Sequence, residues 1–143
     1  MIDIISRQRK RRLNARHWRQ FTTESLRAIK REGRDVSIVF VSNAAIRKLN
    51  KQFRGKDYAT DVLSFPTESE QFEKQLSLGE IVIATDRAAV QAKENGLNFE
   101  NEIEQLILHG LLHLCGYDHE TDNGEMNRLE LKLRKKLGIQ DRE

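Results

Sequence analysis

The sequence predicts an α+β fold, in which helices pack on a mixed β-sheet of about four strands. Short apolar segments of strand character are interleaved with helical segments in an irregular order, whereas a strict alternation would indicate a parallel sheet. No glycine-rich phosphate loop follows any of these strands, which argues against a doubly wound domain. A chain of 143 residues without a linker-like stretch is expected to form one domain over residues 1–143.

The first half of the chain is expected to contain three strands and two helices. The strand segments are short and rich in β-branched residues. The first helix is predicted from apolar members such as Trp18 and Leu26, and the second from a cap at Ser42 or Asn43. The expected elements are a strand at 2–6, a helix at 15–31, a strand at 36–42, a helix at 44–53 and a strand at 62–65.

The second half follows a polar loop at 67–77 and is expected to contain one strand and three helices. Thr85 or Asp86 is predicted to cap the first helix and Asn98 the second, because short polar side chains accept hydrogen bonds from free amides at a helix start. The last helix has an apolar stripe that favours core packing. The expected elements are a strand at 79–85 and helices at 87–94, 99–115 and 126–137.

Positive charge is concentrated at the start of the chain. Residues 1–34 carry 11 Lys and Arg against 3 Asp and Glu, whereas the remainder carries 14 against 19. Within the densest run, Arg9, Lys10, Arg11 and Arg12 can either bind the phosphates of a nucleic acid or form a solvated face. Charge alone leaves both alternatives open.

Neither a membrane segment nor a disulfide framework is expected. No apolar run approaches the roughly 18 residues that cross a bilayer, and no stretch resembles a signal peptide. The single cysteine, Cys115, excludes an intramolecular disulfide and is expected to be a small apolar filler. The protein is therefore expected to be cytoplasmic.

Three of the four histidines lie within eleven residues, in the run His109-Gly-Leu-Leu-His113-Leu-Cys-Gly-Tyr-Asp-His119. A spacing of four places the first two on one face of a helix, and Gly116 allows a turn that brings the third towards them. A hydrogen-bonded histidine cluster is the alternative. Because two imidazoles on an otherwise apolar segment need partners, we expect one zinc ion with three histidine ligands and an open position for water.

The residue after the first histidine argues against a protease. Zinc proteases have a glutamate there as the general base, and this chain has Gly110. Peptide hydrolysis by that mechanism is therefore not expected.

The histidine run resembles the signature of the YbeY family, bacterial rRNA maturation factors and single-strand endoribonucleases. Two further blocks, given at the end of this paragraph, agree with the family. Together the matches span roughly residues 36–133. The basic segment that contains Arg9, Lys10, Arg11 and Arg12 lies outside this span. Where the family more often has aspartate, this chain has Glu80, a longer carboxylate that changes the geometry only if it orients a site. The blocks are Phe53-Arg-Gly-Lys-Asp57 with Thr60-Asp-Val-Leu-Ser-Phe-Pro66, and Leu78-Gly-Glu-Ile-Val-Ile83.

The resemblance implies a small zincin-like domain with the metal helix behind the sheet. It implies that His109, His113 and His119 hold one Zn²⁺, and that Arg54 is functionally important. The implied activity is metal-dependent cleavage of single-stranded RNA in maturation of the small-subunit rRNA 3′ end and in ribosome quality control. The implied partners are single-stranded RNA, rRNA and the small ribosomal subunit.

Several roles stay open. Asp118 can fix the tautomer of a ligand imidazole or cap a turn, and Asp61 can hold Arg54 or cap a loop. Tyr117 is expected to pack beside the zinc turn rather than stack on a base. The alternatives to the nuclease are a ribosome-assembly RNA-binding protein with structural zinc, and a zinc hydrolase of another substrate class.

Overall fold

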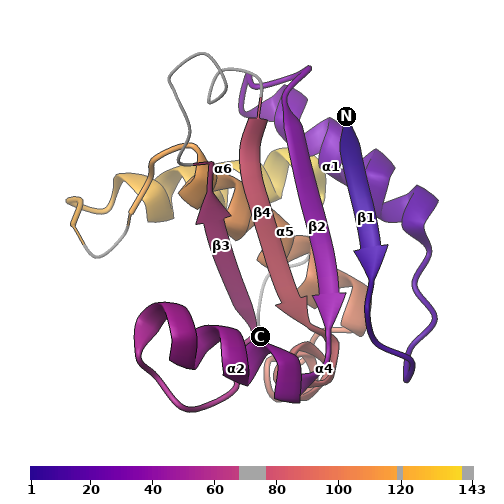
Figure 1. Cartoon of the computed structure of the whole chain (residues 1–143). Coiled ribbons are helices and arrows are strands. Elements are labelled where there is room, and N and C mark those ends of the chain that lie inside the picture. Colours follow the sequence, from indigo (N-terminus) through magenta and orange to yellow (C-terminus); the bar gives the residue numbers. More distant parts are fainter. Residues whose placement is uncertain (68–76, 119–120, 140–143) are drawn as a thin grey trace.

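The structure, a computed structural model, describes residues 1–67, 77–118 and 121–139. Its centre is a mixed sheet with the strand order β1-β2-β4-β3 (Figure 1). β1 runs parallel to β2 and β2 parallel to β4, whereas β3 is antiparallel to β4. This confirms the predicted fold class. The strands are β1 (Ile2–Ser6), β2 (Asp35–Val41), β3 (Val62–Pro66) and β4 (Ser77–Ala84).

The helices cover the two faces of the sheet unequally. Three of them, α1, α5 and α6, lie behind the sheet, whereas α2 crosses one end of the front face (Figure 1). Within the described residues, no helix has the length and apolar character needed to cross a membrane. The helices are α1 (Ala15–Ala28), α2 (Asn43–Arg54), α4 (Thr85–Glu94), α5 (Phe99–Leu114) and α6 (Glu125–Leu137).

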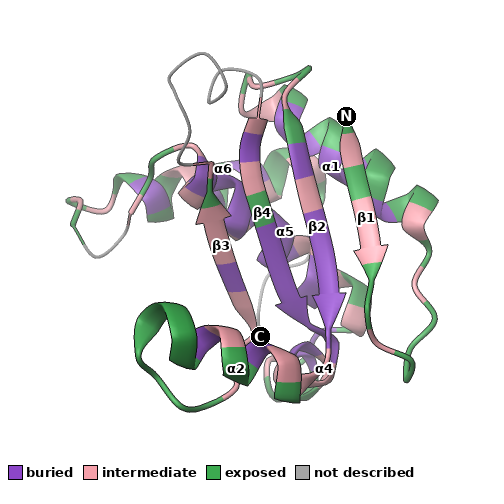
Figure 2. Ribbon diagram, in the orientation of Figure 1, coloured by how far each residue is buried: buried purple, intermediate pink, exposed green. Residues whose placement is uncertain are grey.

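The sheet separates two hydrophobic clusters. The larger cluster lies between the sheet and the rear helices and contains most of the buried side chains of α5. The smaller cluster lies between the sheet and α2 and contains Val39, Ile46 and Val82. Figure 2 shows that the buried residues are concentrated on β2, β4 and α5. Alternate residues of the central strands therefore serve opposite cores, as the pleat requires.

Two of the predicted caps are confirmed and one is wrong. Ser42 caps α2 and Asn98 caps α5 through their side chains. α4 begins at Thr85 after Ala84 and has no side-chain cap, because the strand continues directly into the helix. α1 ends at Ala28 rather than Arg31, and Lys30 takes the left-handed conformation. Most of the predicted 67–77 loop, residues 68–76, lies outside the described residues.

A bulge in β4 determines which face Glu80 occupies. The pairing of β2 with β4 shifts its register between Asp35 and Val36, whose partners are Ser77 and Gly79. Gly79 has φ +134°, and a Cβ there would lie 2.1 Å from the carbonyl oxygen of Phe65, so only glycine fits. As a result Glu80 points to the α2 face, where it lines a cavity with Val82.

Candidate metal centre

Helix α5 packs closely on β4 at the histidine run. A Cβ added to Gly110 would lie 2.9 Å from side-chain carbons of Ile81 on β4. The absence of a side chain at this position therefore allows the helix to approach the strand. The structure thus gives a physical reason for the glycine: this position faces the sheet, so a glutamate here would not fit.

The imidazoles of His109 and His113 converge as the four-residue spacing predicts. Their Nε2 atoms are 3.1 Å apart, and their rings meet edge to face with centroids 4.7 Å apart. The His109 side chain is 30% exposed, so a ligand can reach it from solvent.

A buried carboxylate holds His109 from behind. Its Nδ1 lies 2.9 Å from Oε1 of Glu130 on α6, whose side chain is only 9% exposed. Oε2 of the same carboxylate is 3.6 Å from the guanidinium of Arg134, one helical turn further on. A carboxylate accepts a hydrogen bond from Nδ1–H, and this leaves the lone pair of His109 on Nε2, the atom that faces His113.

The two imidazoles fit a zinc ion. Two nitrogen atoms that each lie 2.0–2.1 Å from a tetrahedral zinc are about 3.4 Å apart, close to the observed 3.1 Å. The same separation allows a hydrogen bond between the two rings, so the histidine-cluster alternative also fits it. The predicted third ligand, His119, lies outside the described residues. Within those residues alone, no group of three or more His, Cys, Asp or Glu side chains can hold a metal ion. The three-histidine set therefore stays a prediction, supported by the geometry of its first two members.

One cavity joins the histidines to other predicted site residues. It has a volume of about 420 Å³ and brings together segments that lie more than 50 residues apart in the chain. Its walls come from the end of α2, the loop before β3, β3 itself, α5 and the turn after it. The lining residues are Arg54, Thr60, Asp61, Val62, Ser64, Pro66, His109, His113 and Asp118.

Arg54 lines this cavity from the last turn of α2. The helix ends there because Gly55 takes a left-handed conformation, φ +69°, and donates its amide to Lys51. Arg54 is exposed, and it forms no ion pair with the part of the chain that the structure describes. The loop after Gly55 is joined to α2 through Asp57, whose carboxylate accepts a hydrogen bond from Arg47 at 2.8 Å. This contact lowers the pKa of Asp57.

Asp61 is engaged in local bonds rather than with the arginine. Its Oδ1 accepts from the amide of Val62 (2.8 Å) and the hydroxyl of Thr60 (3.2 Å). With its amide oriented to satisfy both acceptors, Gln91 donates to Asp61 Oδ2 at 2.9 Å. No ion pair links Asp61 to Arg54 among the described residues. These contacts favour the loop-capping role of Asp61.

The turn after α5 carries the remaining predicted residues. Asp118 lines the cavity, and its backbone carbonyl accepts from the amides of Thr121 and Asp122. Tyr117 instead lines a separate cavity together with Cys115 and Leu129. Burial raises the pKa of the Cys115 thiol. Cys115 packs against the main core, in agreement with its predicted role as an apolar filler.

The basic segment with Arg9, Lys10, Arg11 and Arg12 and the histidine cavity lie at opposite edges of the sheet. It follows β1, whereas the cavity borders β3, and these two strands are the opposite edges of the sheet. Lys10 and Arg11 approach the carboxylate of Asp86 at 3.2 and 3.9 Å, and the guanidinium of Arg11 lies 4.9 Å from the ring centroid of Phe99. Arg9 and Arg12 are exposed.

Glu130 is the residue that the sequence interpretation missed. It lies four residues after Met126 and three before Leu133, so it shares the apolar face of α6 with two core residues. An acidic side chain in a core-facing stripe was a visible signal, because a buried carboxylate needs a hydrogen-bond partner.

Comparison with known proteins gives a consistent result. A family model described as Endoribonuclease YbeY matches residues 3–138. A protein of Nautilia profundicola named Endoribonuclease YbeY is 50% identical over 106 residues, 74% of this chain and 74% of the relative. A protein of the same name from Solibacter usitatus is 46% identical over 108 residues, 76% of this chain and 69% of the relative.

A solved structure agrees with these matches. The solution structure of TM1509 from Thermotoga maritima superimposes with a TM-score of 0.63 at 32% identity, covering 96% of this chain and 89% of that chain. The range matched by the family model is wider than the sequence motifs suggested. It includes the basic segment, which the motif comparison had wrongly left outside.

Proposed function

This chain belongs to the endoribonuclease YbeY family, and on that premise we propose that it is a metal-dependent endoribonuclease of single-stranded RNA that acts in ribosomal RNA maturation. We propose His109, His113 and His119 as the ligands of one zinc ion, and the 3′ end of small-subunit rRNA as the substrate region. The small ribosomal subunit is the partner that this substrate implies.

The observation that carries this proposal is the common cavity of the histidines and Arg54. A phosphodiester gains negative charge on its oxygens as it is cleaved, so a nuclease needs positive charge on more than one side of the phosphorus. A bound zinc ion supplies a Lewis acid for one oxygen and lowers the pKa of a water molecule that it holds. Arg54 supplies a second positive charge.

Arg54 is suited to bind the phosphate rather than to move a proton. A guanidinium stays protonated and donates two parallel hydrogen bonds to two phosphate oxygens. It lies on the last turn of a helix that ends in a C-cap at Gly55, and its exposed side chain lines the cavity.

Glu130 is proposed as a positioning residue for His109. By accepting from Nδ1 it keeps the imidazole in the tautomer that presents Nε2 to a metal, and it restricts rotation of the ring. The nearby guanidinium of Arg134 balances the charge of this buried carboxylate.

The proposal is tested by cleavage of a single-stranded RNA oligonucleotide by the metal-loaded protein. We expect cleavage that stops on addition of a chelator, returns with zinc, and is much slower on a duplex of the same sequence. Cleavage by protein shown by elemental analysis to be metal-free would contradict the metal-dependent mechanism. Full RNA affinity without cleavage would instead indicate the assembly-factor alternative with structural zinc.

A further inference from the structure

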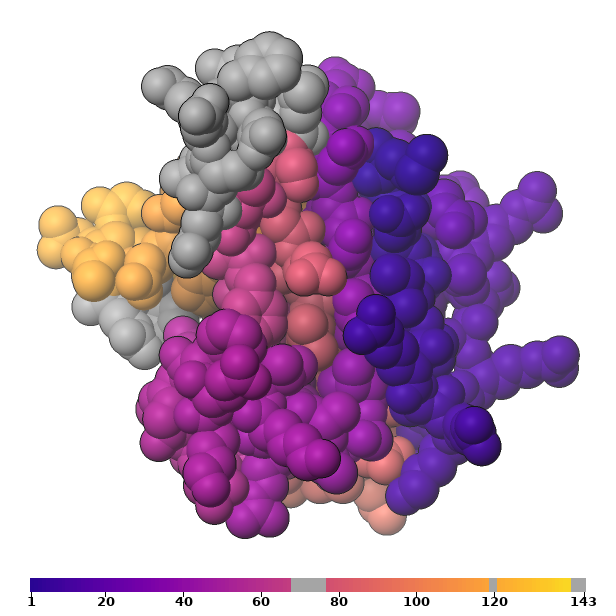
Figure 3. All heavy atoms as spheres, in the orientation of Figure 1, coloured from indigo at the N-terminus to yellow at the C-terminus, as the bar shows by residue number. Residues whose placement is uncertain are grey.

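A second cavity opens on the face of the sheet opposite the histidines. It has a volume of about 310 Å³ and lies beside α2, on the smaller of the two hydrophobic clusters. Figure 3 looks onto this face, where atoms of β4 reach the surface between those of β2 and β3. The lining residues are Arg7, Val39, Val41, Leu49, Phe53, Phe65, Glu80 and Val82.

Two aromatic side chains form one wall of this cavity. Phe53 on α2 is 58% exposed, a large value for a phenylalanine, and it meets Phe65 of β3 edge to face with ring centroids 5.2 Å apart. The two ring planes make an angle of 70°, so the edge contact orients the Phe53 ring and leaves much of its apolar surface exposed.

The aromatic pair and the histidine cavity lie on the two sides of one strand, β3. Phe53 directly precedes Arg54, and Phe65 lies between Ser64 and Pro66, which line the histidine cavity. The two cavities therefore share β3, which is the edge strand of the sheet. A flexible ligand that crosses this edge can occupy both cavities at once.

We propose that Phe53, supported by Phe65, is a stacking site for a base of the RNA strand, next to the phosphate held at Arg54. This inference rests on the proposed nuclease function and extends it to substrate binding. Unpaired bases present a flat aromatic surface that stacks on exposed rings, whereas paired bases in a duplex are already stacked. The site thus supplies a physical basis for single-strand preference.

The size and charge of the cavity favour a nucleotide over a protein partner. A stable protein interface takes about 20–30 residues from each partner, whereas eight of the described residues line this cavity. The Arg7 side chain at its border can contact a backbone phosphate, and the Glu80 carboxylate can accept from the amino group of a base.

The test compares two substitutions of Phe53 in the metal-loaded protein. Phe53→Leu keeps an apolar side chain but removes the aromatic face, and it is expected to raise KM for single-stranded RNA about tenfold with little change in kcat. Phe53→Trp keeps the face and should have a KM near that of the wild type. A titration of Phe53→Trp with a 2′-O-methylated RNA measures binding by quenching of tryptophan fluorescence. Because the native Trp18 is buried, the quenching should come mainly from the new tryptophan.

Tyr58 offers a matched control. It is 54% exposed and lies on the segment after α2, but it lines neither cavity. Tyr58→Leu should leave KM unchanged. An unchanged KM in Phe53→Leu, or an equal increase in Phe53→Leu and Phe53→Trp, would overturn the stacking site while wild-type cleavage still supported the nuclease. A wild-type protein without RNA cleavage would instead remove the proposed function itself.

Discussion

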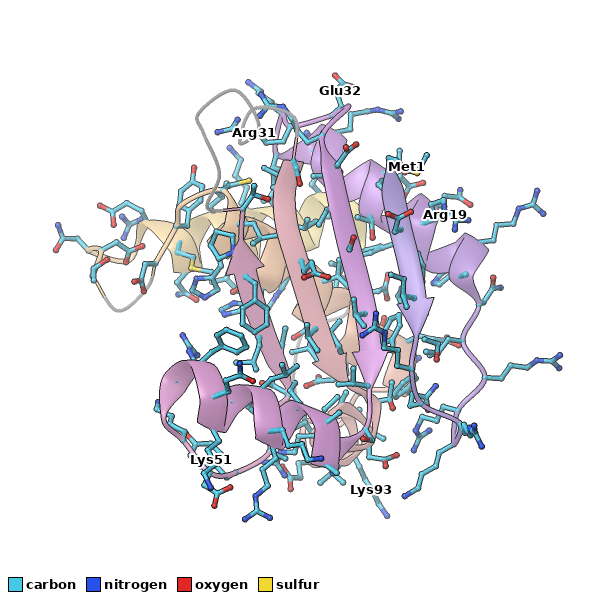
Figure 4. All side chains as sticks on the ribbon, in the orientation of Figure 1. Met1, Arg19, Arg31, Glu32, Lys51 and Lys93 are labelled. Carbon is cyan, nitrogen blue, oxygen red and sulfur yellow. The ribbon has the colours of Figure 1, made fainter. Side chains whose placement is uncertain are left out.

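The two edges of the sheet differ in how they present positive charge. The β1 edge is followed by the densest basic run, whose Lys10 and Arg11 lie against Asp86. On the same side, Arg19 donates to the carbonyl of Ile2 (3.2 Å), and Figure 4 shows it beside β1. At the β3 edge, by contrast, Arg54 shares a cavity with the imidazoles of His109 and His113.

The comparison shows that the densest positive charge and the proposed catalytic cavity lie at opposite edges of the sheet. A run of cations attracts a polyanion over long range, and water screens each charge. The proposed cleavage needs a few groups held close together, and at the β3 edge such groups come from the end of α2, from β3 and from α5. The two regions are expected to respond differently to substitution.

The largest expected effect is at the β3 edge. Arg54→Lys keeps the charge but removes the two-pronged donor geometry, and we expect a loss of about 100-fold or more in the cleavage rate while zinc stays bound. Single-turnover kinetics and metal content of the same preparation measure both quantities. Cleavage at the wild-type rate would show that Arg54 has no part in the reaction.

The next effect tests the support of the metal site. Glu130→Gln should weaken zinc affinity about 10- to 100-fold, because His109 loses the charged acceptor that fixes its tautomer. Competition with a chelating dye measures the affinity, and ¹⁵N chemical shifts of the imidazole report the tautomer. An unchanged affinity would assign Glu130 to packing alone.

A double variant separates this effect from a loss of stability. Glu130→Gln leaves the largely buried Arg134 without its carboxylate, so the fold itself is expected to weaken. In Glu130→Gln with Arg134→Gln the uncompensated cation is gone, and the free energy of unfolding should partly recover. Zinc affinity should stay low, because the acceptor for His109 is still neutral.

A smaller effect is expected at the β1 edge. Replacement of Arg9, Lys10, Arg11 and Arg12 by alanine should reduce the slope of log affinity against log salt by about 1.4 to 2.8, at about 0.7 per phosphate contact. The lower value applies if only Arg9 and Arg12 contact phosphates, since the other two approach Asp86. Filter binding over a salt series measures it, and an unchanged slope would indicate a solvated face.

The smallest expected effect is on stability and concerns Glu104, in the half of α5 that precedes the histidines. Burial raises the pKa of Glu104, although the charge of His17 opposes the shift. A raised carboxyl pKa stabilises the folded state at low pH, and this contribution is lost as pH rises through the folded-state pKa. Glu104→Gln should therefore be more stable than the wild type at pH 7, by at most about 0.5 kcal/mol because water screens the group.

Urea unfolding at two pH values checks this prediction. The advantage of Glu104→Gln should disappear near pH 4, where the wild-type carboxyl is largely protonated. An equal difference between the variant and the wild type at both pH values would mean that burial does not disfavour the charged form of Glu104.

Local patterns in the sequence determined much of the fold and part of the site. The histidine spacing predicts the convergence of His109 and His113, because a helix brings residues four apart onto one face. The same local reasoning placed the strands to within two residues and found two of three helix caps. The element order also predicted a mixed sheet.

Only the tertiary structure decided which distant groups meet. Glu130 reaches His109 from another helix, Gly110 owes its identity to Ile81 on β4, and the bulge at Gly79 turns Glu80 away from the histidine cavity. The physical reason is that these relations depend on helix–sheet packing distance and strand register, which join segments far apart in the chain. Periodicity within one segment carries no information about such distances.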